Sequence, residues 1–316
     1  MFKIRNNKHV IKAALLCLSI GMTHAAQASE TIALPGEALF PEGIASDSAG
    51  GLYVGSLIQG RILYLEPSSK KPRIFAPDGV NGLMAIGGLI VSPDGKTLFA
   101  CNSDLGFGPH SGASSPGLVS FDTKSGAFKK RWAFPNGGLC NDLTMTPDGS
   151  ILLTDSFVPR ILVLKPGAEA LEEWVTNERF TGEGFNLNGI TWSKQGVFAV
   201  KYNSNELFRI GLNADGSAGK VDPVNLSRPL GGPDGIKTLA TGELLVVEGQ
   251  GRLAKIKING LDGSVETIAE GLNVPTTATV VGQTVYVVEG QLDHLPTPDS
   301  EAGAPEPFTL KVLDLP

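Results

Sequence analysis

Four residues with oxygen-bearing side chains stand at similar places in the sequence: Glu42, Asn141, Asn188 and Asp234. Each comes directly before a short apolar run, as in the segments PEGI (41–44) and PDGI (233–236). Asn and Asp also favour turns before strands for local reasons, but four at equivalent positions indicate a binding site. Carboxylate and amide oxygens bind hard cations, and two carboxylates balance a 2+ charge. We therefore predict one divalent cation, with Ca2+ favoured and Mg2+, Mn2+ and Zn2+ as alternatives.

The elements that must position these residues form an internal repeat. Six segments share a turn-like start, a short apolar strand, a polar turn with glycine, a second apolar strand, a loop and a third strand. With Glu42, Gly88, Asn141, Asn188, Asp234 and Thr276 taken as equivalent, the steps are 46, 53, 47, 46 and 42 residues. Four-stranded propeller blades are about 40–50 residues long. The spacing predicts an all-β fold, a six-bladed β-propeller with four-stranded blades.

The predicted blades follow the repeat. Five cover residues 43–76, 88–133, 143–176, 189–226 and 235–269. The sixth has three clear strands, the last near 308–315, and a strand at 31–34 supplies its fourth. This N-terminal strand closes the ring and removes a free sheet edge, which an all-β protein must otherwise protect.

The topology predicts that the four oxygen-bearing residues meet at one mouth of the central channel. Loops that enter the first strand of a blade share this face with the loops after the second strand. Two such loops are long, and they carry His110 and His294. We expect either histidine to serve as an acid or base, or to be an exposed bystander. Asp155 and Glu248, with Lys201 and Glu289, end second strands on the same face and are candidate substrate contacts, with surface charge as the alternative.

Composition and charge restrict the class of protein. The 316 residues carry a formal charge of −6, which disfavours a nucleic-acid partner. Residues 1–28 combine four basic residues, a ten-residue apolar run and a small-x-small site ending at Ala28. This pattern predicts a signal peptide and an exported, periplasmic or secreted protein without membrane contact after cleavage. Residues 29–316 then form a single domain with a formal charge of −10; its oligomeric state is not predicted.

Two cysteines, Cys101 and Cys140, remain after the predicted cleavage. Export permits a disulfide between them, and two buried thiols are the alternative. The two remaining histidines cannot build a three-histidine zinc site. Any metal site must therefore be ligated mostly by oxygen.

The blade starts resemble those of the senescence-marker-protein (regucalcin)/gluconolactonase family. The matching residues are Pro41-Glu42-Gly43-Ile44, Asn141-Asp142, Asn188-Gly189-Ile190 and Pro233-Asp234-Gly235-Ile236. The resemblance implies a six-bladed propeller with one divalent cation in its channel. It implies that Glu42, Asn141, Asn188 and Asp234 hold this cation, and that Asp234 is the general base of lactone hydrolysis. The cation would polarise the carbonyl group.

One departure from this family concerns the substrate. Sugar-lactone hydrolases of the family often carry an arginine near the asparagine of the third blade, but Leu139 stands two residues before Asn141 and no arginine is close. This favours a less polar ligand. Phe107, Phe157 and Phe185 would suit one, although apolar residues near a channel are also common packing residues.

Three functions remain open at this point. The first is an exported, divalent-metal-dependent hydrolase that acts on a lactone or ester of a small molecule. The second is a non-catalytic propeller that binds a ligand or partner and contains a structural metal. The third is an enzyme similar to strictosidine synthase, which the Asn/Asn/Asp set disfavours. A Ser-His-Asp hydrolase is not expected, because the sequence contains no G-x-S-x-G motif.

Overall fold

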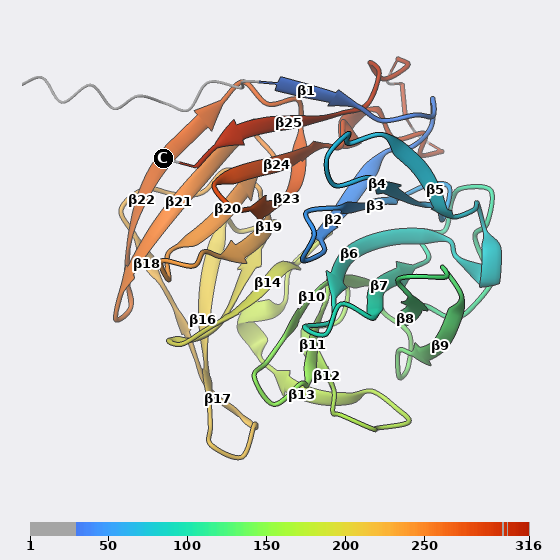
Figure 1. Cartoon of the computed structure of the whole chain (residues 1–316). Coiled ribbons are helices and arrows are strands. Elements are labelled where there is room, and N and C mark those ends of the chain that lie inside the picture. Colours follow the sequence, from blue (N-terminus) through green and yellow to red (C-terminus); the bar gives the residue numbers. More distant parts are fainter. Residues whose placement is uncertain (1–29, 299, 302, 316) are drawn as a thin grey trace, which may run out of the picture.

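A computed structural model describes residues 30–298, 300, 301 and 303–315. The predicted signal peptide, 1–28, lies outside these residues. Figure 1 shows the described sheets arranged as six blades around a central channel, which confirms the predicted six-bladed β-propeller. No described helix is long and apolar enough to cross a membrane.

Each of the first three blades consists of four consecutive strands, ordered from the channel outward. Blade 1 contains β2 (Pro41–Ser46), β3 (Leu52–Ser56), β4 (Ile62–Leu65) and β5 (Pro72–Ala76). Blade 2 contains β6 (Ala85–Val91), β7 (Thr97–Ser103), β8 (Gly117–Asp122) and β9 (Phe128–Ala133). Blade 3 contains β10 (Cys140–Met145), β11 (Ile151–Asp155), β12 (Arg160–Leu164) and β13 (Glu172–Thr176).

The other three blades differ at their outer edges. Blade 4 contains β14 (Leu187–Ser193), β15 (Gly196–Lys201), β16 (Glu206–Leu212) and β17 (Ala218–Pro223). Blade 5 contains β19 (Pro233–Thr238), β20 (Leu244–Glu248), β21 (Arg252–Asn259), β22 (Asp262–Glu270) and a short outer strand, β18 (Asn225–Leu226). Blade 6 contains β23 (Pro275–Val281), β24 (Thr284–Glu289), β25 (Thr309–Asp314) and β1 (Glu30–Ala33). The 3-10 helices η1 (Val80–Gly82), η2 (Glu178–Phe180) and η3 (Leu292–His294) lie in loops.

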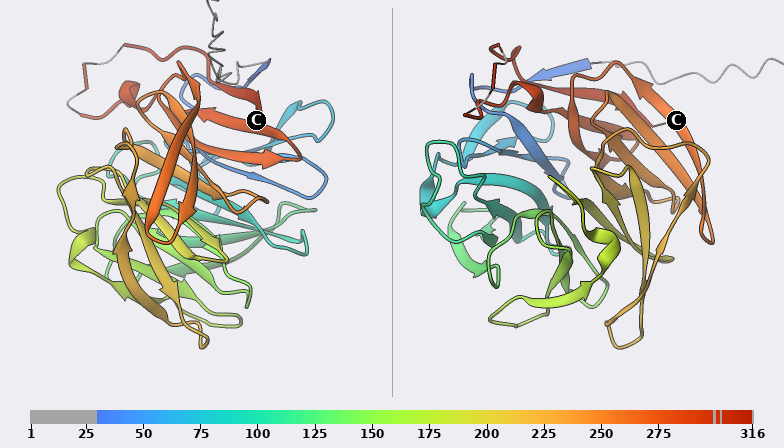
Figure 2. Two further views of the ribbon diagram at one scale, coloured as in Figure 1. Left: turned by 90° about the vertical axis from the view of Figure 1, so that its left-hand side faces the viewer. Right: turned by 180° about the vertical axis from the view of Figure 1, so that it is seen from behind.

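The N-terminal strand closes the ring as predicted. β1 pairs antiparallel with β25, with Glu30 opposite Val312, and Figures 1 and 2 show the two strands side by side. One predicted boundary is wrong. Residues 225–226 were expected in blade 4, but β18 pairs in parallel with β22 and therefore extends blade 5.

The hydrophobic core lies between neighbouring blades. Second strands such as β11 and β20 are buried along their whole length, whereas the outermost β13 is mostly exposed. In one core cluster, Cys101 and Leu118 of blade 2 pack with Leu143 and Leu153 of blade 3. Burial on both faces explains why the second strands read as continuous apolar runs in the sequence.

A disulfide joins two of these blades. Cys101 of β7 is bonded to Cys140 of β10, with 5.2 Å between their Cα atoms. Of the two states that the sequence left open, the structure therefore contains the disulfide, and the interpretation as two thiols is wrong.

A β-bulge recurs near the start of every innermost strand. The register shifts between Pro41 and Ile44 in blade 1 and at the corresponding place in the other five blades. A bulge places two residues opposite one and re-aims their side chains. In blade 2 the shift lies between Ile86 and Leu89, so Gly87 is the residue equivalent to Glu42. The predicted equivalence of Gly88 is wrong by one residue.

The glycines that follow the oxygen-bearing residues are required by close backbone contact. A Cβ atom on Gly43 would lie 2.0 Å from the carbonyl oxygen of Gly87 in the next blade. A Cβ atom on Gly189 would lie 2.4 Å from the carbonyl oxygen of Asp234. The Glu-Gly and Asn-Gly pairs of the repeat therefore have a physical cause. The first residue carries the polar side chain, and the second lets the inner strands approach one another.

Candidate functional site

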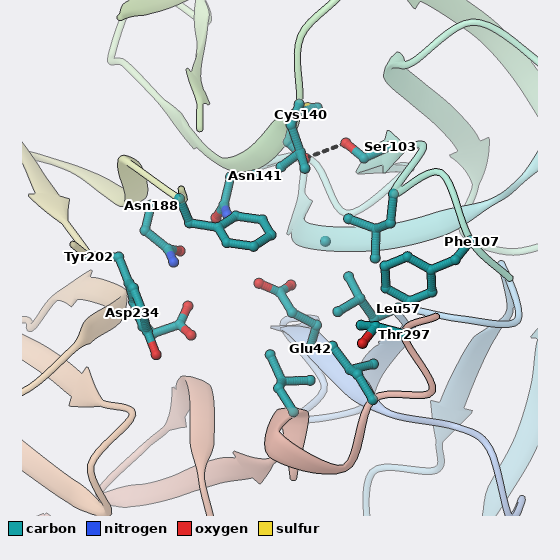
Figure 3. A pocket seen from close by; sticks show the side chains of 16 residues that line it. Glu42, Leu57, Ser103, Phe107, Cys140, Asn141, Asn188, Tyr202, Asp234 and Thr297 are labelled. Carbon is teal, nitrogen blue, oxygen red and sulfur yellow. Dashed lines mark hydrogen bonds between the residues drawn. The ribbon is translucent and has the colours of Figure 1, made fainter. Parts of the chain in front are cut away.

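The four predicted metal ligands occupy the same place in four blades. Each is the second residue of its innermost strand and the first residue of its bulge: Glu42 in β2, Asn141 in β10, Asn188 in β14 and Asp234 in β19. We expected these residues directly before their strands, whereas each strand begins one residue before its predicted ligand. Figure 3 shows their side chains pointing toward one another at the floor of a cavity.

This group of side chains is buried and incompletely hydrogen-bonded. All four residues are between 5% and 8% exposed. Glu42 Oε2 and Asn141 Oδ1 are buried and have no hydrogen-bond partner among the described residues. Burying a polar atom without a hydrogen-bond partner costs folding free energy, and burying two carboxylates that face each other costs more. A cation at this point would satisfy both orphaned oxygens.

The electrostatics of the two carboxyl groups agree with this interpretation. Burial, and then the charges of Asp234 and Asp142, raise the pKa of Glu42 well above its ordinary value. Burial and Asp142 likewise raise the pKa of Asp234, although a hydrogen bond from Asn188 opposes this increase. The described residues contain no group of three or more His, Cys, Asp or Glu side chains that could hold a metal. The candidate centre therefore depends on two carboxylates and two amides, a donor set that fits a hard divalent cation.

A narrow space of about 10 Å³ continues the channel below the candidate centre. Asp142 and Lys237 line it together with the four predicted ligands. Asp142 Oδ2 accepts a hydrogen bond from the backbone N–H of Ile190, at 3.1 Å. With Glu42, Asp234 and Lys237, this carboxylate gives the channel a formal charge of −2. Our sequence analysis assigned no role to Asp142 or Lys237. Asp142 stands out in the sequence, because four other blades have glycine at its position: Gly43, Gly88, Gly189 and Gly235.

Above the candidate centre lies a cavity of about 250 Å³. The predicted contacts Leu139 and Phe185 both line it, as does Phe107. Phe157 lies outside the lining and packs against Phe185, with 5.4 Å between the ring centroids. Further lining residues, which no sequence pattern indicated, come from the end of β7 and from several separate loops: Leu57, Ser103, Leu105, Tyr202, Leu292, Leu295 and Thr297.

The two histidines are close in sequence to the lining residues Phe107 and Leu295, but neither histidine lines the cavity. His294 ends η3, and its Nδ1 lies 2.9 Å from the carbonyl oxygen of Gly303. His110 approaches Gly79, where an added Cβ would lie 2.5 Å from His110 Nδ1. Neither is among the described residues that line the cavity. The structure therefore does not bring the predicted acid or base candidates to the site.

Asp155 and Glu248 end β11 and β20 as predicted, but both are fully buried and neither lines the cavity. Asp155 accepts hydrogen bonds from the backbone of Leu139 and from Arg160. Glu248 accepts from Arg228 and Arg252, and these bonds keep its pKa below the ordinary value although burial raises it. These carboxylates anchor the loops around the site and do not contact the cavity.

Lys201 and Glu289 have comparable positions. Lys201 Nζ donates to the carbonyl oxygens of Arg179 and Thr181, at 3.0 and 2.8 Å. Glu289 accepts from the backbone of Asn273, at 2.9 Å. These four side chains, at the ends of β11, β15, β20 and β24, therefore hold neighbouring loops in place.

Comparison with known proteins supports the fold. No protein-family model and no curated protein sequence matches the chain. A gluconolactonase from Xanthomonas campestris superposes with a TM-score of 0.65 at 18% identity, over 92% of this chain and 90% of that one. A luciferin-regenerating enzyme superposes with a TM-score of 0.66 at 16% identity, over 90% and 96%. Virginiamycin B lyase from Staphylococcus aureus superposes with a TM-score of 0.60 at 14% identity, over 91% and 99%.

These likenesses confirm the expected resemblance at the level of the fold. The chain is a six-bladed β-propeller similar to gluconolactonase-like proteins. At such low identity the shared fold does not determine the reaction, since propellers support several chemistries.

Proposed function

We propose that this protein is an exported hydrolase that opens the lactone or ester bond of a small molecule and depends on a divalent cation. The observation that carries the proposal is the pair of orphaned oxygens, Glu42 Oε2 and Asn141 Oδ1, at the floor of an otherwise well-formed cavity. Glu42, Asn141, Asn188 and Asp234 would hold the cation, with Ca2+ favoured. When bound there, it would supply Lewis-acid polarisation of the substrate carbonyl.

The residues of the chain would carry out the proton transfers. Asp234 faces the cavity and would accept a proton from the attacking water, whose oxygen forms the new bond to the carbonyl carbon. The bond between this carbon and the ring or ester oxygen then breaks, and the proton passes to the leaving oxygen. Asn188, which donates a hydrogen bond to Asp234, would hold the carboxylate in position. The disulfide between Cys101 and Cys140 supports the proposed export, because disulfides persist in oxidising compartments.

The experiment is a hydrolysis assay with lactones and aryl esters. The purified protein is assayed after treatment with EDTA, and then with Ca2+, Mn2+, Mg2+ or Zn2+ restored. We expect turnover to require a cation and to fall at least about 100-fold in Asp234→Asn, as for loss of a general base. Asp314→Asn, an exposed aspartate at the end of β25, is the matched control. Turnover that persists in EDTA would contradict the proposal. Cation binding without any turnover would favour the non-catalytic propeller instead.

A further inference from the structure

The walls of the cavity are apolar, in contrast to its floor. Leu57, Leu105, Phe107, Leu139, Phe185, Leu292 and Leu295 supply most of the lining. Among the described lining residues, only Glu42 and Asp234 carry charge, and both belong to the floor. Polar side chains above the floor are restricted to Ser103, Tyr202 and Thr297.

One of these three polar groups is already engaged. Ser103 Oγ donates to the carbonyl oxygen of Cys140 at 2.8 Å, as Figure 3 shows. A sugar lactone carries several hydroxyl groups, and each one buried without a partner costs free energy. Tyr202 and Thr297 can serve at most a few of them. The walls therefore suit a hydrocarbon chain better than a polyhydroxylated one.

The apolar walls are held in fixed loops. Leu292 and Leu295 lie in the segment between β24 and β25, which Gln291 and Glu306 tie together. Gln291 Nε2 donates to the Glu306 carbonyl at 3.1 Å, and the Glu306 N–H donates to Gln291 Oε1 at 2.8 Å. Gln291 itself is only 2% exposed. These hydrogen bonds therefore hold this wall in place.

A second part of the wall is organised in a similar way. Phe107 and Leu105 lie in the loop between β7 and β8, where Asp104 accepts bonds from Gly106, Ser111 and Gly112 at 2.9, 2.6 and 2.8 Å. A preorganised apolar pocket loses little ordering free energy when a ligand binds.

We propose that the substrate of this site is a lactone that bears a hydrocarbon substituent. This inference rests on the proposed function. The ester carbonyl lies at the floor, against Glu42, Asn141, Asn188 and Asp234, and the alkyl chain runs up between the walls formed by Leu139 and Leu295. The cavity of about 250 Å³ is slightly smaller than a typical ligand pocket, which indicates a small ring with one chain.

The test is a series of γ-lactones whose alkyl chain grows from none to eight carbons, with glucono-1,5-lactone as the polar comparison. We expect kcat/KM to rise about fourfold per methylene, the factor that corresponds to burial of one CH2 group. The rise ends when the chain emerges from the cavity. A flat series, or a preference for glucono-1,5-lactone, would overturn the inference while the hydrolase proposal stands.

Two variants connect the chain-length effect to the walls. Leu295→Ser is expected to reduce the ratio of kcat/KM for the octyl and unsubstituted lactones by about tenfold. Ile74→Ser removes an exposed apolar side chain of β5, the outermost strand of blade 1 and not part of the lining, and is expected to leave this ratio unchanged. An unchanged ratio in Leu295→Ser would overturn the placement of the chain.

A binding measurement separates this inference from the proposed function. The γ-lactams with and without an octyl chain replace the ester oxygen by N–H and resist hydrolysis. We expect only the alkyl lactam to raise the melting temperature of the protein. If no lactone is hydrolysed but the alkyl lactam still stabilises the protein, the hydrolase proposal is wrong and the apolar ligand class stands. If neither lactam stabilises the protein, the ligand class is overturned.

Discussion

The buried ion pair between Asp155 and Arg160 supports the loop that leads into the candidate centre. Asp155 is fully buried, and Arg160 is 2% exposed. Arg160 Nε donates to Asp155 at 3.0 Å, and the same guanidinium donates to the carbonyl oxygens of Pro135 and Gly137 at 2.8 and 2.6 Å. Asp155 also accepts the N–H of Leu139, two residues before Asn141. The pair therefore fixes the backbone that positions both a cavity wall and a predicted ligand.

Replacing Arg160 by methionine would leave the Asp155 carboxylate buried without its cation. Breaking a buried pair in this way costs about 3–5 kcal/mol, because the remaining charge stays desolvated. For a domain of this size, the loss corresponds to a fall in melting temperature of roughly 5–8 °C. Two carbonyl oxygens also lose a donor, which adds to the cost.

The assay is urea denaturation of the wild type and Arg160→Met, monitored by tryptophan fluorescence, with the midpoint and slope fitted separately. Lys165→Met is the matched control, since the Lys165–Glu172 pair spans 2.9 Å but both side chains are more than 60% exposed. Such an exposed pair contributes at most about 1 kcal/mol. If Arg160→Met proves no less stable than Lys165→Met, the loop is held by other contacts and the reasoning fails.

Three further predictions test other parts of the structure. Replacing Cys101 and Cys140 by alanine opens a loop of 39 residues and should lower the free energy of unfolding by about 4 kcal/mol, measured against the protein with its disulfide intact. Gly43→Ala should lower the free energy of unfolding by about 1–3 kcal/mol, because its Cβ would meet the Gly87 carbonyl. In the control Gly303→Ala the Cβ meets nothing within 4 Å, so stability should not change. Equal melting temperatures of the two variants would contradict this prediction. Arg252→Gln should weaken the hold on Glu248, whose pKa lies below its ordinary value in the folded protein. A carboxyl group whose pKa is lowered in the folded protein stabilises the fold at pH values above its unfolded pKa of about 4.3. The wild type should therefore be more stable than the variant at pH 7. That advantage should shrink as the pH falls below 4, and a pH-independent difference would refute it.

The repeat made the fold predictable from the sequence. The six repeat starts are spaced at the length of a blade, and the second strands are apolar because neighbouring blades bury them on both faces. The four oxygen-bearing residues were also predictable, because they stand at equivalent positions of the repeat, and three of them precede a glycine that close contact between the inner strands requires. The error at Gly88 arose because two consecutive glycines, Gly87 and Gly88, conceal the register of the bulge.

The walls of the cavity were less predictable. Leu57, Tyr202 and Leu295 come from loops of different blades, and their sequence spacing bears no relation to their distance in space. Asp155 and Glu248 were predicted on the correct face, but their burial depends on arginines that the repeat does not specify. The positions of His110 and His294 outside the lining depend on loop conformations that have no periodic pattern.

Calcium binding to the EDTA-treated protein tests the central claim most directly. The measurement is isothermal titration calorimetry of the wild type and of Asn188→Leu, a variant that removes one predicted ligand oxygen without changing the charge. We predict one binding site per chain in the wild type and an affinity at least about tenfold weaker in the variant, as expected when a metal site loses an oriented partner. Asp314→Asn should bind as the wild type does. A wild type that binds none of Ca2+, Mg2+, Mn2+ or Zn2+, or an Asn188→Leu variant with undiminished affinity, would contradict a metal centre formed by Glu42, Asn141, Asn188 and Asp234.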